Sequence, residues 1–196
     1  MTAGELDKDL IESRAYRLLA DVPDWVWNGE ELPVPIEEIV DSVFGLQVRY
    51  VESMSMAPGC EEIPHDQLSG LLLTSVGEIW VNAWEADEFP GRGRFTVGHE
   101  LGHWTMHSVG RGSGETVHCR KVEAAGEETA EPESENRPPK PLPEKEADTF
   151  SAALLMPEHL IREHHALDPD VAGLCERFET SRKAMNYRLV SLALTS

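Results

Sequence analysis

Two histidines four residues apart, His99 and His103, flank the acidic residue Glu100 in the run His-Glu-Leu-Gly-His. On a helix, residues four apart lie on one face, so both imidazoles can reach a single metal ion. Glu100 follows the first histidine directly and can remove a proton from a water molecule bound to that ion. The chemistry that this spacing indicates is metal-assisted hydrolysis, with zinc as the expected ion.

The residues around this motif favour a helix. Residues 94–98 contain no proline, and small or apolar residues recur at helical spacing, namely Phe95, Gly98, Leu101, Gly102 and Thr105. Two glycines inside a helix cost roughly 1 kcal/mol each relative to alanine, a cost that is explained if another element must approach the backbone closely. The alternative is a core helix with two incidental histidines, because so short a motif also arises by chance.

A catalytic zinc needs three protein ligands, so one ligand must come from outside the motif. His107 lies one turn beyond His103, but a regular helix carries it past the ion, and we expect it to pack or to face solvent. The metzincin spacing is absent as well, since Met106 and Val109 stand where that pattern needs glycine and histidine.

A second predicted helix, between Pro143 and Pro157, supplies carboxylates for the third position. Glu144 and Asp148 lie four apart on one face. Glu144 can complete the metal site, while Asp148 accepts a hydrogen bond from the far ring nitrogen of a ligand histidine. Glu146 is a rival ligand that requires another rotation of the helix. Alternatively, Glu144 and Asp148 are solvated charges that the helix dipole favours in a first turn.

Several stretches of the chain together resemble the ImmA/IrrE family of metallopeptidases. They are SGLL at 69–72, IWVN at 79–82, GRFTVGHELGH at 93–103, EKEADTFSAALLMP at 144–157 and, more weakly, residues 178–189. The resemblance covers roughly residues 35–192 and implies that His99, His103 and Glu144 bind zinc and that Glu100 is the general base. The chain departs from the family in length, because 41 positions separate His103 from Glu144 and include a long insertion.

The sequence predicts one α+β domain over residues 1–196, mainly helical, with a small antiparallel or mixed sheet beside the helix of the motif. We expect helices over 6–21 and 36–44, the second with Pro35 in its first turn and Gly45 as its C-terminal cap. A strand is expected over 46–51, and a hairpin around Gly77 over 71–82. With the resemblance, this is a small zincin-like peptidase domain, in which a strand edge can hold an extended substrate.

Residues 110–143 are rich in glycine, glutamate and proline and bury little apolar surface, so we expect a mobile acidic insertion. Its place between the predicted ligands allows a lid, although a solvated insertion is the simpler interpretation. Cys119 within it could bind the open zinc position through sulfur, but we favour an ordinary small residue.

A pair of helices is expected over residues 168–196, starting at Asp168 and, after a turn, at Thr180 or Ser181. The pair imitates a helix-turn-helix and carries the basic residues Arg182, Lys183 and Arg188. A packing role within the peptidase fold is the favoured interpretation. Nearby histidines are either surface residues or hydrogen-bond donors at the cleft: His159, His164 and His165.

Charge and composition also bear on nucleic-acid binding, on the location in the cell and on membrane insertion. The net charge of −19 opposes direct binding of nucleic acid. Three scattered cysteines, an odd number, indicate reduced thiols and a cytoplasmic location. We expect no signal peptide, since the first residues lack an apolar core, and no transmembrane helix.

The function that these features favour is a zinc-dependent endopeptidase. The family resemblance implies a regulatory protein as substrate, such as a helix-turn-helix repressor of mobile elements or stress genes. One alternative is a regulator that binds a partner protein with little or no turnover, and another is a DNA-binding regulator that uses the C-terminal helix pair. Glu100 favours the enzyme, because a pure binding module needs no general base, and the acidic balance opposes the DNA-binding alternative.

Overall fold

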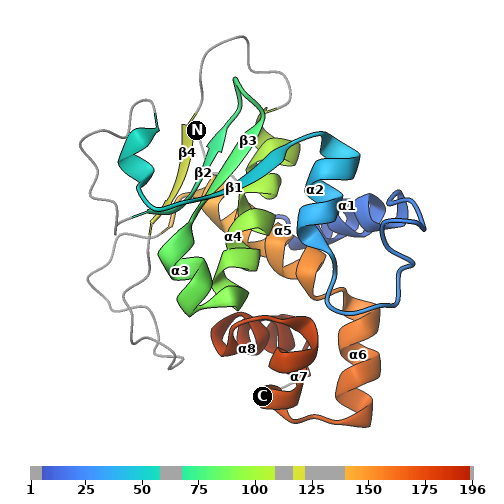
Figure 1. The fold of residues 1–196 in the computed structure, drawn as a ribbon. Coiled ribbons are helices and arrows are strands. Elements are labelled where there is room, and N and C mark those ends of the chain that lie inside the picture. Colours follow the sequence, from blue (N-terminus) through green and yellow to red (C-terminus); the bar gives the residue numbers. More distant parts are fainter. Residues whose placement is uncertain (1–5, 58–67, 109–116, 122–139, 195–196) are drawn as a thin grey trace.

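The computed structural model describes residues 6–57, 68–108, 117–121 and 140–194. Within these ranges a four-stranded mixed sheet lies against a set of helices, with a long helix running along one face of the sheet (Figure 1). This arrangement confirms the predicted α+β class and the small mixed sheet beside the helix of the motif.

The sheet has the strand order β1-β3-β2-β4. Its strands are β1 (Gln47–Val51), β2 (Leu68–Leu73), β3 (Glu78–Asn82) and β4 (Val117–Lys121). β1 pairs with β3 in parallel, whereas β2 is antiparallel to both β3 and β4. The predicted hairpin is present, and Gly77 at its turn has φ +69°, a left-handed conformation that favours glycine.

Two helices precede the hairpin, close to where the apolar spacing predicts them. α1 (Lys8–Ala20) begins at Asp7, whose side chain accepts a hydrogen bond from the Leu10 backbone N–H at 3.0 Å. α2 (Ile36–Phe44) ends at Gly45, whose φ of +63° is the left-handed conformation of a C-terminal glycine cap.

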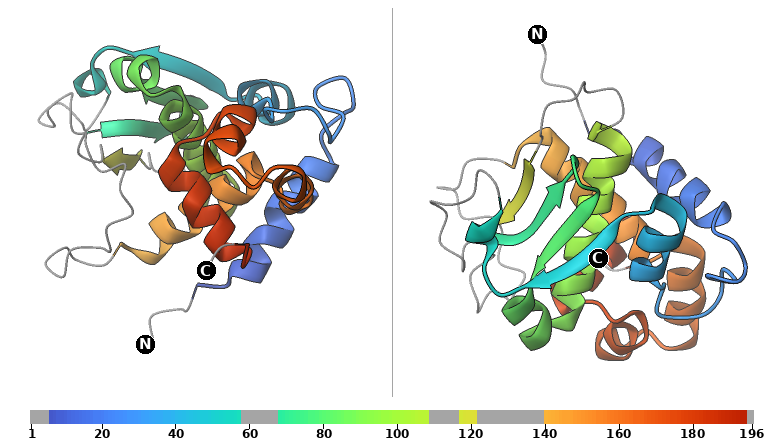
Figure 2. Two further views of the ribbon diagram at one scale, coloured as in Figure 1. Left: turned by 90° about the horizontal axis from the view of Figure 1, so that it is seen from below. Right: turned by 45° about the horizontal axis from the view of Figure 1, so that its top comes forward.

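The central helix is α4 (Pro90–His103), which continues into a π-helical turn, Trp104–Ser108. A short helix, α3 (Ala83–Glu88), precedes it and was not expected from the sequence. α4 lies between the sheet and α5 (Leu142–Leu155), and α1 packs against α5 farther out (Figure 2). Residues 96–103 of α4 are all buried. A helix surrounded in this way is core on every side, whatever the polarity of its residues.

The C-terminal helices α6 (Glu158–Leu167), α7 (Val171–Phe178) and α8 (Arg182–Ser191) lie together at the end of the molecule opposite the hairpin (Figure 1). The predicted helix pair is therefore present as α7 and α8. Ser181 caps α8 by accepting a hydrogen bond from the Ala184 backbone N–H at 3.2 Å. Apolar residues of both helices belong to the main core, namely Leu174, Phe178, Met185 and Leu189.

Two apolar clusters occupy the two sides of the sheet. The main core joins β2 and β3 to the helices. A smaller cluster lies on the other side. There Met54 and Ala57, in and just after a 3-10 turn (Met54–Met56), pack with Leu68, Leu71 and Leu73 of β2 and Trp80 of β3. Every residue of β2 is buried for this reason.

The predicted insertion at 110–143 falls mostly outside the described residues. Within it, residues 117–121 form β4 and pair with β2, and α5 begins at Leu142, slightly earlier than predicted. The strand was not expected, because the segment around it is polar. The side chain of Cys119 lies outside the described part of the chain, and so does the role that the sequence suggests for its sulfur.

Candidate metal centre

His99 and His103 lie one turn apart on α4, and both side chains are fully buried. Their ring centroids are 4.8 Å apart, and the two Nε2 atoms face each other at 3.1 Å. The helical stacking predicted from the four-residue spacing is therefore observed, and it directs the same nitrogen of each ring to one point.

The two glycines of the motif let α5 approach α4 closely. A Cβ atom at Gly98 would lie 2.6 Å from the Ser151 Oγ, and one at Gly102 would lie 3.1 Å from the Ala147 Cα. Ser151 also donates a hydrogen bond from its hydroxyl to the Phe95 carbonyl at 2.9 Å. The glycines thus set the distance between the helix that carries the histidines and the helix that carries the acidic residues.

Glu144, in the first turn of α5, points toward both histidines. Its Oε2 lies 3.3 Å from His99 Nε2, and its Oε1 lies 3.1 Å from His103 Nε2. The three residues form a group that could hold a metal ion. Ligand atoms around a tetrahedral zinc, each about 2.0–2.1 Å from the ion, stand about 3.3 Å apart. The separations and the nitrogen and oxygen donors therefore fit zinc.

The electrostatics of Glu144 also suit a ligand. Burial raises the pKa of this carboxyl group, but hydrogen-bonding contacts with His103 and His99 outweigh burial and hold the pKa well below its usual range. The carboxylate is therefore ionised at neutral pH, as an oxygen ligand must be.

Asp148 lies one turn after Glu144 and contacts the opposite side of the His99 ring. Its Oδ1 accepts a hydrogen bond from His99 Nδ1 at 2.9 Å, because a carboxylate can only accept. Because Asp148 keeps a proton on Nδ1, a metal ion would take the place of the proton on Nε2, the nitrogen that faces Glu144 and His103. This is the tautomer and the carboxylate contact found around metal-ligating histidines.

The rotation of α5 about its axis directs Glu144 toward the two histidines of the motif and Glu146, the alternative ligand, away from them. Glu146 faces His107 instead, with 3.4 Å between Glu146 Oε2 and His107 Nε2. His107 lies in the π-helical turn, and its ring centroid is 5.5 Å from that of His103. Neither residue belongs to the group that could hold a metal ion, which agrees with the expectation that His107 packs or faces solvent and does not bind the ion.

Glu100, the predicted general base, is fully buried between α4 and the sheet. Gly70 on β2 provides the room, since a Cβ atom there would lie 3.2 Å from Glu100 Oε1 and would overlap with Thr96 Cγ2. Gly70 is therefore a residue of the site that is absent from the candidates predicted above. A glycine inside a buried strand is a known sign of close approach by another group, so the signal was present.

The remaining sequence candidates lie elsewhere on the C-terminal helices. His159 lies within 3.4 Å of the Gly29 carbonyl, and His164 accepts a hydrogen bond from Arg177 at 3.1 Å. Arg188 is buried and pairs with Glu12 on α1. One of the three basic residues of the helix pair is therefore used inside the molecule, as a packing role requires.

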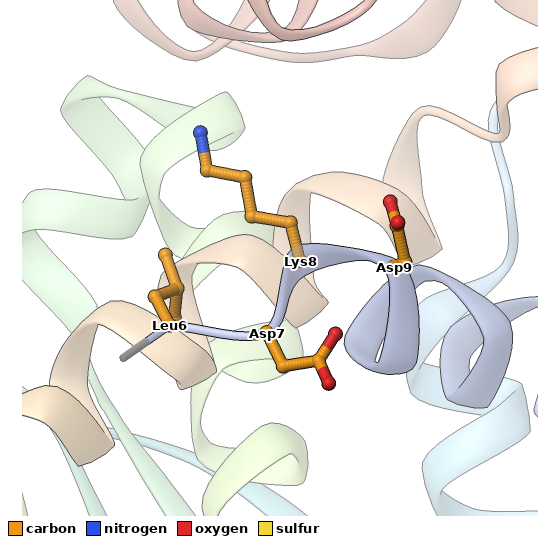
Figure 3. A pocket seen from close by; sticks show the side chains of 4 residues that line it. All are labelled: Leu6, Asp7, Lys8 and Asp9. Carbon is orange, nitrogen blue, oxygen red and sulfur yellow. The ribbon is translucent and has the colours of Figure 1, made fainter. Parts of the chain in front are cut away.

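A separate pocket lies at the beginning of α1 and is lined by Leu6, Asp7, Lys8 and Asp9 (Figure 3). Asp7 is already used there as the N-cap of α1, and Lys8 and Asp9 are exposed. None of the residues lining the pocket belongs to the histidine and glutamate cluster, so the two features are independent.

Comparison with known proteins agrees with this geometry. The family model of the IrrE N-terminal-like domain, a peptidase model, matches residues 66–190, from the start of the hairpin into α8. No curated protein matches the chain. Among the described helices, none is both long enough and apolar enough to cross a membrane. Because the matched region covers more than half of the chain and contains the whole cluster, the chain belongs to the peptidase family of the IrrE N-terminal-like domain.

Proposed function

We propose that this protein is a zinc-dependent endopeptidase, with His99, His103 and Glu144 as zinc ligands and Glu100 as the general base. The observation that carries the proposal is the convergence of two imidazole nitrogens of α4, the helix that also holds Glu100, with the Glu144 carboxylate of α5, at separations of 3.1–3.3 Å. Membership of a peptidase family supports peptide bonds as the substrate class.

When bound, zinc would acidify a water molecule and polarise the carbonyl group of a peptide bond. The residues of the chain complete this chemistry. Glu100 takes the proton of the attacking water and returns it to the leaving amine. Asp148 holds the proton on His99 Nδ1, so that Nε2 of this ring remains available as a ligand.

The proposed substrate is a regulatory protein of the same cell, such as a helix-turn-helix repressor. The support for this finer proposal is the family resemblance. The acidic character of the chain adds a physical reason, since a net charge of −19 attracts basic partners and repels nucleic acid. DNA-binding proteins carry basic surfaces. The acidic enzyme would therefore attract a repressor protein and repel the DNA to which the repressor binds.

The test compares the wild type with Glu100→Gln on candidate repressors encoded in the same genome, with fragments identified by mass spectrometry. The amide keeps the size of the side chain but cannot accept a proton at neutral pH. We expect a loss of about 10²–10⁴-fold in the rate of cleavage, with zinc content and thermal unfolding unchanged. Glu146→Gln is the control, because Glu146 is also a carboxylate near the site but contacts His107.

Two outcomes would contradict the proposal. Cleavage by Glu100→Gln at the wild-type rate would exclude Glu100 as the base. If the zinc-loaded wild type bound a repressor tightly but never cleaved it, the endopeptidase hypothesis would be wrong. The result would favour the alternative, a regulator that binds its partner without turnover.

A further inference from the structure

Lys140 lies directly before α5 and contacts the carboxylate that orients His99. Its Nζ forms a short ion pair with Asp148 Oδ2. The other oxygen of the same carboxylate, Oδ1, accepts the hydrogen bond from His99 Nδ1 at 2.9 Å. Lys140, Asp148 and His99 therefore form a chain of contacts that begins at the surface and ends at a predicted zinc ligand.

Exposure decreases along this chain of contacts. The side chain of Lys140 is 37% exposed, that of Asp148 is 26% exposed and that of His99 is fully buried. An ion pair as exposed as Lys140 with Asp148 contributes at most about 1 kcal/mol to stability. The main effect of the ion pair is therefore on the orientation of the Asp148 carboxylate, and its effect on the stability of the fold is small.

The carboxylate needs an anchor because its surroundings are acidic. Glu144 and Asp148 are four residues apart on α5, and like charges at this spacing repel each other. Glu146 on the same turn adds a third negative charge, and the whole chain is acidic. A free Asp148 would gain by rotating toward solvent, away from Glu144. Lys140 offsets this repulsion and holds Oδ2, which leaves Oδ1 directed at His99.

We propose that Lys140 is a positioning residue of the metal centre. By fixing the Asp148 carboxylate, it keeps the hydrogen bond to His99 Nδ1 short and holds the His99 ring with Nε2 toward Glu144 and His103. The inference rests on the proposed zinc site, in which His99 is a ligand, and adds a residue from outside all the stretches that carry the family resemblance.

The test uses three variants and protein labelled with ¹⁵N at histidine. Lys140→Gln removes the charge and the anchor, and Lys140→Arg keeps both. Lys145→Gln is the matched control, because Lys145 is a lysine on α5 that carries the same charge next to Glu144. The substitution therefore removes an equal charge from the neighbourhood of the same carboxylates while leaving Lys140 in place.

The first readout is the exchangeable proton on His99 Nδ1, measured in metal-free protein. A proton shared with a carboxylate and fully buried gives a low-field signal that exchanges slowly with water. We expect Lys140→Gln to shift this signal upfield and to speed its exchange, while Lys140→Arg and Lys145→Gln resemble the wild type. A signal in Lys140→Gln that matches the one in Lys145→Gln would overturn the proposal.

The second readout is zinc affinity, measured by competition with a chelator. Loss of a partner that orients a ligand costs about 10–100-fold in affinity, and Lys140 acts one contact farther out, so we expect a weakening of up to about 10-fold in Lys140→Gln. Loss of one positive charge alone would favour a cation, and Lys145→Gln measures that effect. Affinity in Lys140→Gln equal to or tighter than in Lys145→Gln would count against positioning.

The two readouts separate this inference from the proposed function. If the wild type binds no zinc, the proposed enzyme fails, whereas the proton signal of metal-free protein still supports or overturns the role of Lys140 in orienting His99.

Discussion

Two regions of the molecule bury charged groups between helices, and they differ in what these groups face. At the C-terminal end, Arg188 of α8 donates a hydrogen bond from Nε to the Met156 carbonyl at 2.9 Å and pairs through both terminal nitrogens with the Glu12 carboxylate. Between α4 and α5, His99, His103 and Glu144 instead bring three ligand atoms to one point.

The comparison shows that burial by itself does not identify a functional residue. Arg188 is as deeply buried as the two histidines, but its donors meet acceptors and its charge meets an opposite charge within the protein. The cluster joins atoms whose lone pairs a metal ion uses, and one negative charge that the ion would offset. A buried charged group whose partners complement it has a structural role. Several metal-binding atoms that converge on one point, as in this cluster, indicate instead a site for a bound ion.

The largest effect that the comparison predicts is on zinc. Glu144→Gln should weaken zinc binding by more than about 100-fold, because removal of a ligand costs more than removal of a group that orients one. Glu146→Gln should leave about one zinc per chain, since Glu146 faces His107. Elemental analysis and chelator competition on both variants measure this. Retention of zinc in the first variant and its loss in the second would assign the ligand to Glu146.

A smaller effect is predicted at the other region, and it should be on stability alone. Arg188→Met should lower the free energy of unfolding by about 2–3 kcal/mol, because the Met156 carbonyl and the Glu12 carboxylate lose their partner. Zinc content should not change. Arg162→Met is the matched control, since Arg162 also bonds a backbone carbonyl, that of Leu192 at 3.3 Å, and pairs with a carboxylate, Glu158. Its ion pair lies at the surface, where such pairs contribute about 1 kcal/mol or less, so a smaller loss is expected.

Denaturant unfolding of the two arginine variants, each with zinc counted, checks this contrast. A loss of zinc in Arg188→Met without a loss of stability would show that the two regions are coupled and that the comparison is wrong.

What the sequence could predict depends on how local each feature is. The stacking of His99 on His103 follows from one helix, so the four-residue spacing was sufficient. The choice of Glu144 over Glu146 depends on the rotation of α5 against α4, which spacing within α5 does not determine. The preference for Glu144 came from its sharing a helix face with Asp148, in a chain that also carries the histidine motif, and the family resemblance agreed with it. The structure places Glu144 beside the histidines.

Features that depend on contacts between distant segments were not predicted. β4 lies in a polar segment and exists by pairing with β2, so its own residues give little indication of a strand. Gly70 and Lys140 matter through contacts with Glu100 and Asp148, which lie 30 and 8 positions away. A single sequence records neither contact. The short helix α3 was missed because six residues carry too little periodicity.

The smallest predicted effect concerns the packing that holds the two helices of the site together. Gly98→Ala adds a methyl group that would meet Ser151 Oγ at 2.6 Å, and overpacking of this kind costs about 1–3 kcal/mol. Alanine also favours the helix by about 1 kcal/mol relative to glycine. The net loss of unfolding free energy should therefore be between about 0 and 2 kcal/mol, with weaker zinc binding because Ser151 and α5 must move away from α4.

Ser151→Ala separates the two contributions. Alone it removes the hydroxyl that bonds the Phe95 carbonyl, and we expect a loss of about 1 kcal/mol. In the double variant, the methyl group introduced by Gly98→Ala no longer meets the oxygen, so the two changes together should cost at least about 1 kcal/mol less than their sum. Additive effects, with zinc affinity unchanged in Gly98→Ala, would mean that α5 can shift freely along α4. The glycines would then not set the separation of Glu144 from the histidines, and the close packing of this region would be incidental to its cluster.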